Sequence, residues 1–118
     1  MSETARVLEI VRPHLDAISP CIPRTQRGLF GKCGMFSEAL VARIKPDFPV
    51  RRVPGDWIGP MTNTRWLQEG YSGGVGHIWV ELQIDGKVWW VDPTARQFHG
   101  RMPFPLLTRP GRTAYLKV

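Results

Sequence analysis

The sequence predicts a single α+β domain. Two stretches with apolar residues at spacings of three and four lie in the first half of the chain, and β-rich runs separated by turn residues fill the second half. The length of 118 residues suits one domain with one modest core, so we expect residues 1–118 to form one unit. A hydrophobic fraction of 42% and a charged fraction of 22% indicate an ordinary globular chain rather than a disordered one.

Two helices are expected. The first covers residues 3–18, where Ser2 or Thr4 can act as the N-cap and Pro13 should kink or split the helix. Its apolar stripe consists of Val7, Leu8, Val11, Leu15 and Ile18. After a loop over residues 19–32, the second helix should start near Cys33 and end at about Ile44. Its stripe consists of Phe36, Leu40 and Ile44, with Ala39 alongside.

The remaining elements are expected to be strands and loops. Residues 48–53 fit a short strand, and residues 54–76 fit a long loop rich in glycine and proline that carries three large aromatic side chains. These aromatics are Trp57, Trp66 and Tyr71. A hairpin should follow over residues 77–94, and residues 113–118 alternate in a way that fits a final strand.

The hairpin turn fixes which side chains share a face. Asp85-Gly86 is a strong two-residue turn signal, so Ile84 should lie opposite Lys87. Side chains alternate between faces, which makes His77 and Asp92 diagonal neighbours on one face, with Cα atoms roughly 7–8 Å apart. Trp79 would lie across from Asp92 and shield the pair from water. The opposite face is nearly all apolar and should pack on a helix.

Cys33, His77 and Asp92 are the parts of an activated sulfur nucleophile. A thiol at a helix N-terminus is favoured as thiolate by unpaired backbone N–H groups and the helix dipole. Gly34 leaves space for a substrate backbone. The backbone N–H of Cys33 can bind a developing oxyanion, and Gln26 is a candidate side-chain donor beside it. Lys32 and Trp79 are alternative donors, and Gln26 equally fits a plain loop residue.

The long aromatic loop is a candidate wall of a substrate cleft. Trp57, Trp66 and Tyr71 would supply apolar contact area, together with Trp79 on the hairpin. The structural alternative is a loop attached to the core by buried tryptophans. One prediction separates the two: at least one of the loop aromatics should border the pocket that contains the thiol.

A metal site is the main chemical alternative to the nucleophile. Zinc ligands could come from Cys21, Cys33, His77 and His99, but these residues lack the paired spacing of structural zinc sites. We therefore expect no metal and no cofactor. Cys21 and His99 stay without an assigned role.

The net charge of +6 is spread along the chain without a dense basic run, which favours a genome rich in arginine codons over a specific acidic partner, and we expect no nucleic-acid partner. The expected partner is a protein or peptide substrate, for which an acidic surface is one option. No apolar run is long enough to span a bilayer, and the N-terminus lacks the pattern of a secretory signal. The expected location is therefore the cytoplasm, which leaves open delivery as an effector by another route.

The motifs resemble those of the transglutaminase-like branch of the papain-like cysteine hydrolases. The matching residues are Cys33-Gly34 at a helix start, Gly76-His77-Ile78-Trp79-Val80-Glu81, and Trp90-Val91-Asp92-Pro93-Thr94. The continuation through Phe98 looks like small bacterial and phage members, among them papain-fold toxin domains that deamidate glutamine. The resemblance covers about residues 26–98, at the level of motifs, and implies a papain-like core with the cysteine-bearing helix packed on a small antiparallel sheet.

The resemblance implies a cysteine hydrolase that works through a thioester acyl-enzyme. Cys33 would be the nucleophile, His77 the general base and acid, and Asp92 the residue that orients His77. Such enzymes include proteases, glutamine deamidases and transamidating transglutaminases, and hydrolysis is favoured here because the chain is short for an enzyme that must hold two protein substrates. The alternative from another class is a protein- or nucleic-acid-binding module on the same fold, without turnover.

Overall fold

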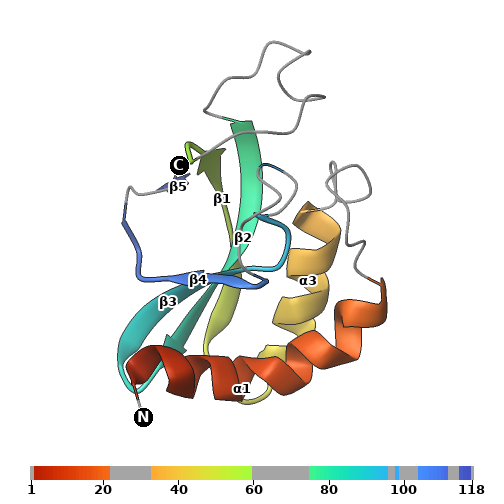
Figure 1. Ribbon diagram of the computed structural model, residues 1–118, viewed down its shortest axis with the longest axis vertical. Coiled ribbons are helices and arrows are strands. Elements are labelled where there is room, and N and C mark those ends of the chain that lie inside the picture. The colour runs from red at the N-terminus through yellow and green to blue at the C-terminus, as the bar shows by residue number, and fades with distance from the viewer. Residues whose placement is uncertain are drawn as a thin grey trace.

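The computed structural model describes residues 2–21, 33–59, 75–95, 98, 104–111 and 115–117. Within this part the chain is a small α+β fold, in which two α-helices lie against an antiparallel sheet (Figure 1). In chain order the elements are α1 (Glu3–Ile18), the 3-10 turn η1 (Ser19–Cys21), α3 (Cys33–Ile44), β1 (Val50–Trp57), β2 (Val75–Ile84), β3 (Lys87–Asp92), β4 (Leu106–Thr108) and β5 (Tyr115–Lys117). The order of the five described strands across the sheet is β4-β3-β2-β1-β5.

Both helices agree with the sequence analysis. Ser2 caps α1, since its side-chain oxygen accepts the backbone N–H of Ala5 at 3.1 Å. The helix is continuous across Pro13, so the expected split at that residue is wrong. Cys33 is the first residue of α3, as predicted from the apolar repeat that follows it. The thiol therefore lies at a helix N-terminus.

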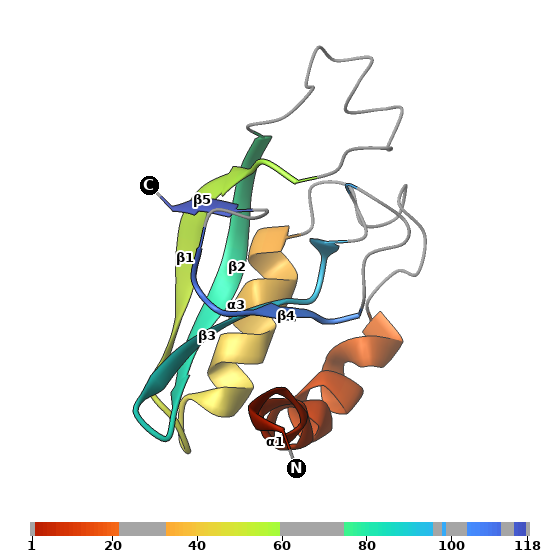
Figure 2. The ribbon, with the colours of Figure 1, turned by 60° about the vertical axis from the view of Figure 1, so that its left-hand side comes forward.

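One face of the sheet packs on the two helices (Figure 2). The buried residues of this core share the stripe positions of α1 and α3 and the apolar face of the hairpin. They are Val7, Val11, Leu15, Leu40, Ile44, Val80, Leu82, Ile84, Trp89 and Val91. Burial of this apolar surface holds α3, and with it Cys33, against β2.

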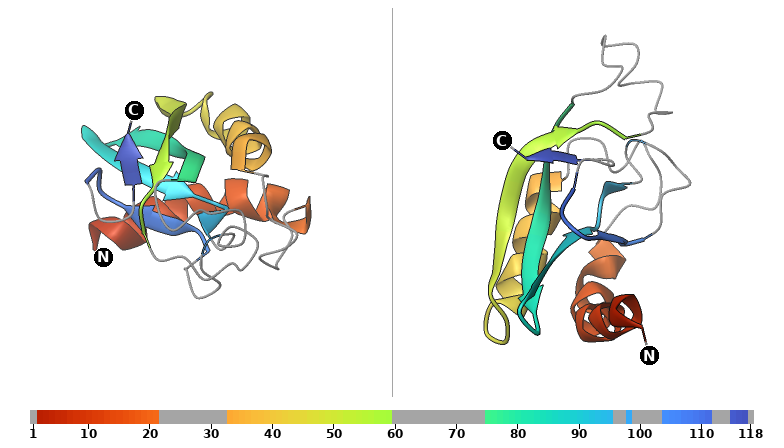
Figure 3. Two further views of the ribbon diagram at one scale, coloured as in Figure 1. Left: turned by 90° about the horizontal axis from the view of Figure 1, so that it is seen from above. Right: turned by 90° about the vertical axis from the view of Figure 1, so that its left-hand side faces the viewer.

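The other face of the sheet forms a second, mainly aromatic core. Its members are Val53, Trp57, Trp79, Trp90, Ala95, Phe98 and Tyr115. This is the face on which His77 and Asp92 were predicted to lie. A packed cluster of rings covers the described part of it, and β5 lies next to the end of β1 where Trp57 stands (Figure 3).

The predicted hairpin register is confirmed. Ile84 lies opposite Lys87 and Val80 opposite Val91. Asp85 and Gly86 both adopt positive φ, 53° and 77°, as a tight two-residue hairpin turn requires. The turn is tied to the start of α1 by an ion pair between Arg6 Nε and Asp85 Oδ2 at 2.7 Å, and by a second ion pair between Lys87 and Glu3.

The strand expected over residues 48–53 is longer than predicted. β1 continues through Pro54 and Gly55 to Trp57, so the expected loop over residues 54–76 is wrong at both of its ends. Pro54 lies opposite Ile78. The carbonyl of Ile78 accepts a hydrogen bond from Ser37 on α3, so the backbone polar groups of Ile78 point away from β1. Proline is tolerated here because no β1–β2 hydrogen bond is lost at this pair.

The short strand β4 was not predicted, and the final strand was. β4 (Leu106–Thr108) directly follows Phe104-Pro105 and pairs with the end of β3. β5 (Tyr115–Lys117) lies within the predicted range 113–118. None of the helices in the described part of the chain is both long enough and apolar enough to span a membrane.

Candidate active site

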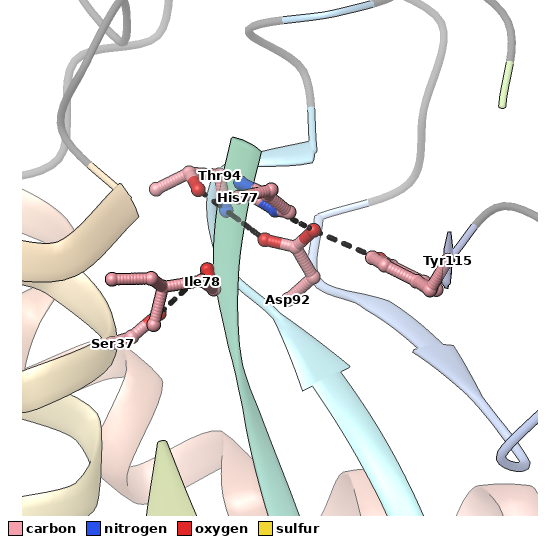
Figure 4. A network of polar contacts seen from close by, with 6 residues as sticks. All are labelled: Ser37, His77, Ile78, Asp92, Thr94 and Tyr115. Carbon is pink, nitrogen blue, oxygen red and sulfur yellow. Dashed lines mark hydrogen bonds and ion pairs between the residues drawn. The ribbon is translucent and has the colours of Figure 1, made fainter. Parts of the chain in front are cut away.

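His77 and Asp92 form a buried pair on the aromatic face of the sheet. The distance from His77 Nε2 to Asp92 Oδ2 is 2.7 Å, and the two side chains are 0% and 1% exposed (Figure 4). An ionised carboxylate can only accept, so Nε2 carries the proton and donates it to Asp92. The diagonal placement predicted from the hairpin register is confirmed.

Asp92 accepts further hydrogen bonds from two other residues. Its Oδ1 accepts from the backbone N–H of Thr94 at 2.9 Å and from the Thr94 hydroxyl at 3.3 Å. Its Oδ2 accepts from the Tyr115 hydroxyl at 2.8 Å in addition to His77 (Figure 4). The carboxylate is therefore held at both oxygens, by its own turn on one side and by β5 on the other.

Cys33 reaches this pair from the opposite side of β2. It is half-buried at the start of α3. One turn further along the helix, the buried Ser37 donates its hydroxyl to the carbonyl of Ile78 at 3.2 Å, so the helix is bonded to the strand next to His77. A methyl group added at Gly34 would contact the Ile78 side chain at 3.6 Å, which shows how closely the helix start approaches β2.

The β2–β3 ladder opens at the level of the site. The pairing extends from the turn to Val80 opposite Val91 and does not include Trp79 and Asp92 among the described pairs. Above that point the edge of β2 faces α3 instead of β3, and the carbonyl of Ile78 bonds to Ser37. This opening lets a helix on one face of the sheet and a carboxylate from β3 act on the same histidine.

The electrostatic environment favours a thiolate–imidazolium pair. Burial alone raises the pKa of the Cys33 thiol, but the interactions with the His77 imidazole and the backbone of Ile78 outweigh it, and the pKa is lowered from its usual 9.0. Burial lowers the pKa of His77, yet the charge and hydrogen bond of Asp92, together with Cys33, raise it from 6.5 to about 9. The two shifts reinforce each other, because the negative thiolate of Cys33 and the positive imidazolium of His77 stabilise each other.

The second ring nitrogen of His77 is the one left for proton transfer. Nδ1 is buried and has no hydrogen-bond partner within the described part of the chain, while Nε2 is bonded to Asp92. The thiol interacts with the ring without a well-formed hydrogen bond in this resting arrangement. Catalytic hydrogen bonds are often long in the free enzyme and tighten when substrate binds.

Aromatic rings enclose the histidine on the side away from the thiol. Phe98 meets His77 edge-on with ring centroids 4.8 Å apart, and Trp57 does so at 6.3 Å. Trp79 and Tyr115 lie roughly parallel to the imidazole at 6.0 and 6.2 Å. A low-dielectric surrounding of this kind strengthens the His77–Asp92 interaction.

Two of the proposed substrate contacts need correction. Trp57 lies on β1 rather than in a loop, and both Trp57 and Trp79 are 0% exposed within the aromatic core. Neither side chain has surface to offer a substrate, because both are packed inside the aromatic core with Trp90, Phe98 and Tyr115. Their role is to enclose His77, which matches the expectation that Trp79 shields the pair from water.

Several of the predicted residues lie outside the described part of the chain. These are Gln26 and Lys32, proposed as oxyanion donors, Trp66 and Tyr71, proposed as cleft residues, and His99. The side chain of Cys21 is likewise not described. Within the described residues, no group of three or more His, Cys, Asp or Glu side chains is arranged to hold a metal ion.

Three residues at the site were not singled out in the sequence. Thr94 had a signal, because Asp-Pro-Thr places a threonine two positions after an aspartate, the spacing of a side-chain-to-backbone turn. Ser37 had a weaker one, as a polar residue next to Phe36 on the buried stripe. Tyr115 had none, since its contact with Asp92 joins β5 to β3, two strands that β1 and β2 separate in the sheet.

Comparisons with protein-family models, curated proteins and solved structures give no significant match. They do not bear on the transglutaminase-like assignment, which stays a prediction based on the motifs.

Proposed function

We propose that this protein is a cysteine-dependent amide hydrolase, a protein glutamine deamidase or a peptidase, with Cys33 as nucleophile. The observation that carries the proposal is the position of His77. One of its nitrogens is bonded to a buried carboxylate, the other has no hydrogen-bond partner among the described residues, and a helix-terminal thiol of lowered pKa interacts with the ring. This is the relation of groups that a cysteine–histidine–aspartate triad needs.

The first half-reaction uses the thiolate and the imidazolium together. The Cys33 thiolate attacks the carbonyl carbon of a carboxamide, and the backbone N–H of Cys33 can stabilise the oxyanion. His77 then gives its Nδ1 proton to the leaving nitrogen, and ammonia or an amine departs as the thioester forms. Asp92 keeps the Nε2 proton in place throughout, so that Nδ1 is the nitrogen that exchanges protons.

The second half-reaction regenerates the pair. Neutral His77 takes a proton from water at Nδ1, and the resulting hydroxide attacks the thioester carbon. The Cys33 thiolate leaves, the product departs as a carboxylic acid that loses its proton to solvent, and His77 is again protonated. Because the first half-reaction needs the imidazolium, turnover should decline as the pH rises through about 9, where His77 loses its proton.

The test combines trapping and product analysis. Wild-type protein and Cys33→Ala are incubated with p-nitrophenyl acetate and with glutamine-containing peptides, and both protein and peptides are analysed by mass spectrometry. We expect an acetyl group on Cys33 in the wild type alone, and deamidation or cleavage of peptides that depends on Cys33. A Cys21→Ser variant is the matched control and should behave as the wild type.

Binding without turnover is the contrary outcome. If Cys33 is never acylated and peptides stay unchanged although they bind, the proposal is wrong and the fold serves as a binding module. Transfer of the acyl group to added amines in preference to water would instead indicate a transamidase.

A further inference from the structure

The contact of Tyr115 with Asp92 connects two strands that are far apart in the sheet. β3 carries Asp92 and β5 carries Tyr115, and β2 and β1 lie between them in the strand order. The tyrosine side chain nevertheless passes beneath these strands on the aromatic face, and its hydroxyl donates to Asp92 Oδ2 at 2.8 Å (Figure 4).

The hydroxyl donates to the same oxygen that accepts the proton of His77. Oδ2 lies 2.7 Å from His77 Nε2 and 2.8 Å from the Tyr115 oxygen, and all three side chains are buried. A phenol bonded to a carboxylate acts as the donor. Oδ2 is therefore occupied as an acceptor from two directions, and the shared proton is favoured on Nε2 rather than on the carboxylate.

We propose that Tyr115 is a positioning residue of the site, which fixes the Asp92 carboxylate so that His77 keeps its proton on Nε2 and presents Nδ1 to Cys33. The inference rests on the proposed function for its catalytic meaning, but its geometric part concerns the His77–Asp92 pair alone. Burial and the charge of Asp92 raise the pKa of Tyr115 well above its usual value, so the phenol stays a neutral donor.

The packing of Tyr115 indicates a role beyond filling space. Its ring lies 4.7 Å from that of Trp79, 5.3 Å from Trp57 and 5.7 Å from Trp90, contacts that a phenylalanine ring can also make. The hydroxyl is thus the part of the residue that packing does not need. Tyr115→Phe removes that group and leaves the rings in place.

Trp90 offers a matched control. It belongs to the same aromatic cluster, touches the Tyr115 ring, and donates one hydrogen bond, from Nε1 to Glu81 at 3.0 Å, rather than to Asp92. Trp90→Phe therefore loses a hydrogen bond and some ring surface without changing the donors of Asp92. Any effect that follows merely from a weakened core should appear in this variant too.

The experiment measures two properties in wild type, Tyr115→Phe and Trp90→Phe. The first is the downfield proton resonance of the His77 Nε2–H bonded to a carboxylate. The second is the rate at which Cys33 is acylated by p-nitrophenyl acetate at neutral pH, normalised to its alkylation rate at high pH, where all the thiol is ionised. Melting temperatures are recorded for all three proteins.

In Tyr115→Phe we expect the resonance to broaden or move, and the normalised acylation rate to fall about tenfold, the size of one hydrogen bond to a charged group. Trp90→Phe should keep both properties even where its melting temperature falls by as much. An unchanged resonance in Tyr115→Phe, or losses in the two variants that follow their melting temperatures alike, would overturn the positioning role. If wild-type Cys33 is not acylated at all, the proposed function fails, and the resonance still decides whether Tyr115 positions the pair.

Discussion

Four donors converge on Asp92 within the described part of the chain, two at each carboxylate oxygen. They are the backbone N–H and the hydroxyl of Thr94 at Oδ1, and His77 and Tyr115 at Oδ2. A carboxylate with this many donors has little freedom to rotate, and it leaves no place for a group that is itself a donor. The pair of Asp92 and His77 should therefore be disrupted when the carboxylate is replaced by an amide, as in Asp92→Asn.

Asp92→Asn should preserve the fold but disable the site. The new amide oxygen can accept from Thr94, which turns the NH₂ group toward the His77 Nε2–H, so that two donors face each other. His77 can escape the clash by moving its proton to Nδ1, and it then no longer serves Cys33 as base. We expect acylation to slow by orders of magnitude, as in other triads with a displaced tautomer. Stopped-flow acylation and circular dichroism test this, and a variant with near wild-type rates would show that Asp92 does not set the tautomer.

The reactivity of Cys33 should depend on His77 in a defined direction. In the wild type, the apparent pKa for alkylation by iodoacetamide should lie below the ordinary thiol value of 9.0. His77→Ala removes the imidazole, whose interaction with the thiol lowers this pKa, and leaves burial and Asp92, which raise it. The apparent pKa should therefore rise above its wild-type value. Measurements in a Cys21→Ser background report Cys33 alone; equal values with and without His77 would contradict the ion pair.

At the scale of elements, the position of the thiol depends on how α3 is attached to β2. Ser37 is buried and bonded to the carbonyl of Ile78, one helical turn from Cys33. The carbonyl has this hydrogen bond because the β2–β3 ladder has already opened below it. The Ser37 hydrogen bond therefore takes the place of a β2–β3 hydrogen bond at Ile78, and it fixes the position of α3 along β2.

Ser37→Ala should weaken both stability and reactivity. It leaves a partly buried carbonyl without its donor, which typically lowers the free energy of unfolding by about 1–3 kcal/mol. The start of α3 also loses its nearest bond to the strand that carries His77, so acylation of Cys33 should slow. Urea unfolding and acylation rates measure the two effects. Ser19→Ala is the control, since its hydroxyl bonds the Asp16 carbonyl at an exposed helix end. Similar losses in the two variants would argue against a special role of Ser37.

The elements also show what local pattern can and cannot predict. The bounds of α3 and the hairpin register followed from apolar spacing and from Asp85-Gly86, because those signals act between near neighbours. The length of β1 did not follow, because Pro54 and Gly55 usually end a strand, and only the orientation of Ile78 across the sheet makes them acceptable. β4 could not be predicted, because three residues are too few to show an alternation of apolar and polar side chains.

At the scale of the whole molecule, the candidate site also has features that depend on near neighbours in the sequence and features that depend on distant strands. The meeting of His77 and Asp92 could be predicted because both lie on one hairpin of fixed register. The roles of Trp57 and Tyr115 could not, since each depends on strands from other parts of the chain that cover the aromatic face. The predicted cleft wall failed for Trp57 for the same reason: a tryptophan in a glycine-rich stretch has the same sequence signal whether it ends up buried or exposed.

Global unfolding should return Cys33 to ordinary thiol chemistry. The groups that lower its pKa come from β2, and no local segment around Cys33 carries them. We expect the apparent pKa of alkylation to return to about that of a free cysteine, 8.5, in concentrated urea. The change should coincide with the loss of helix signal in circular dichroism. A low apparent pKa that persists in urea would place its cause within α3 itself.

The opened ladder between β2 and β3 has a consequence for the life of the chain before it is folded. The contact that sets α3 into this gap joins positions 41 residues apart, and contacts of such separation form late because loop closure must come first. Before folding is complete, His77 and Ile78 do not lie beside Cys33, so the cysteine has the pKa of an ordinary thiol. The lowered pKa of the thiol thus arises only in molecules that have completed their tertiary structure.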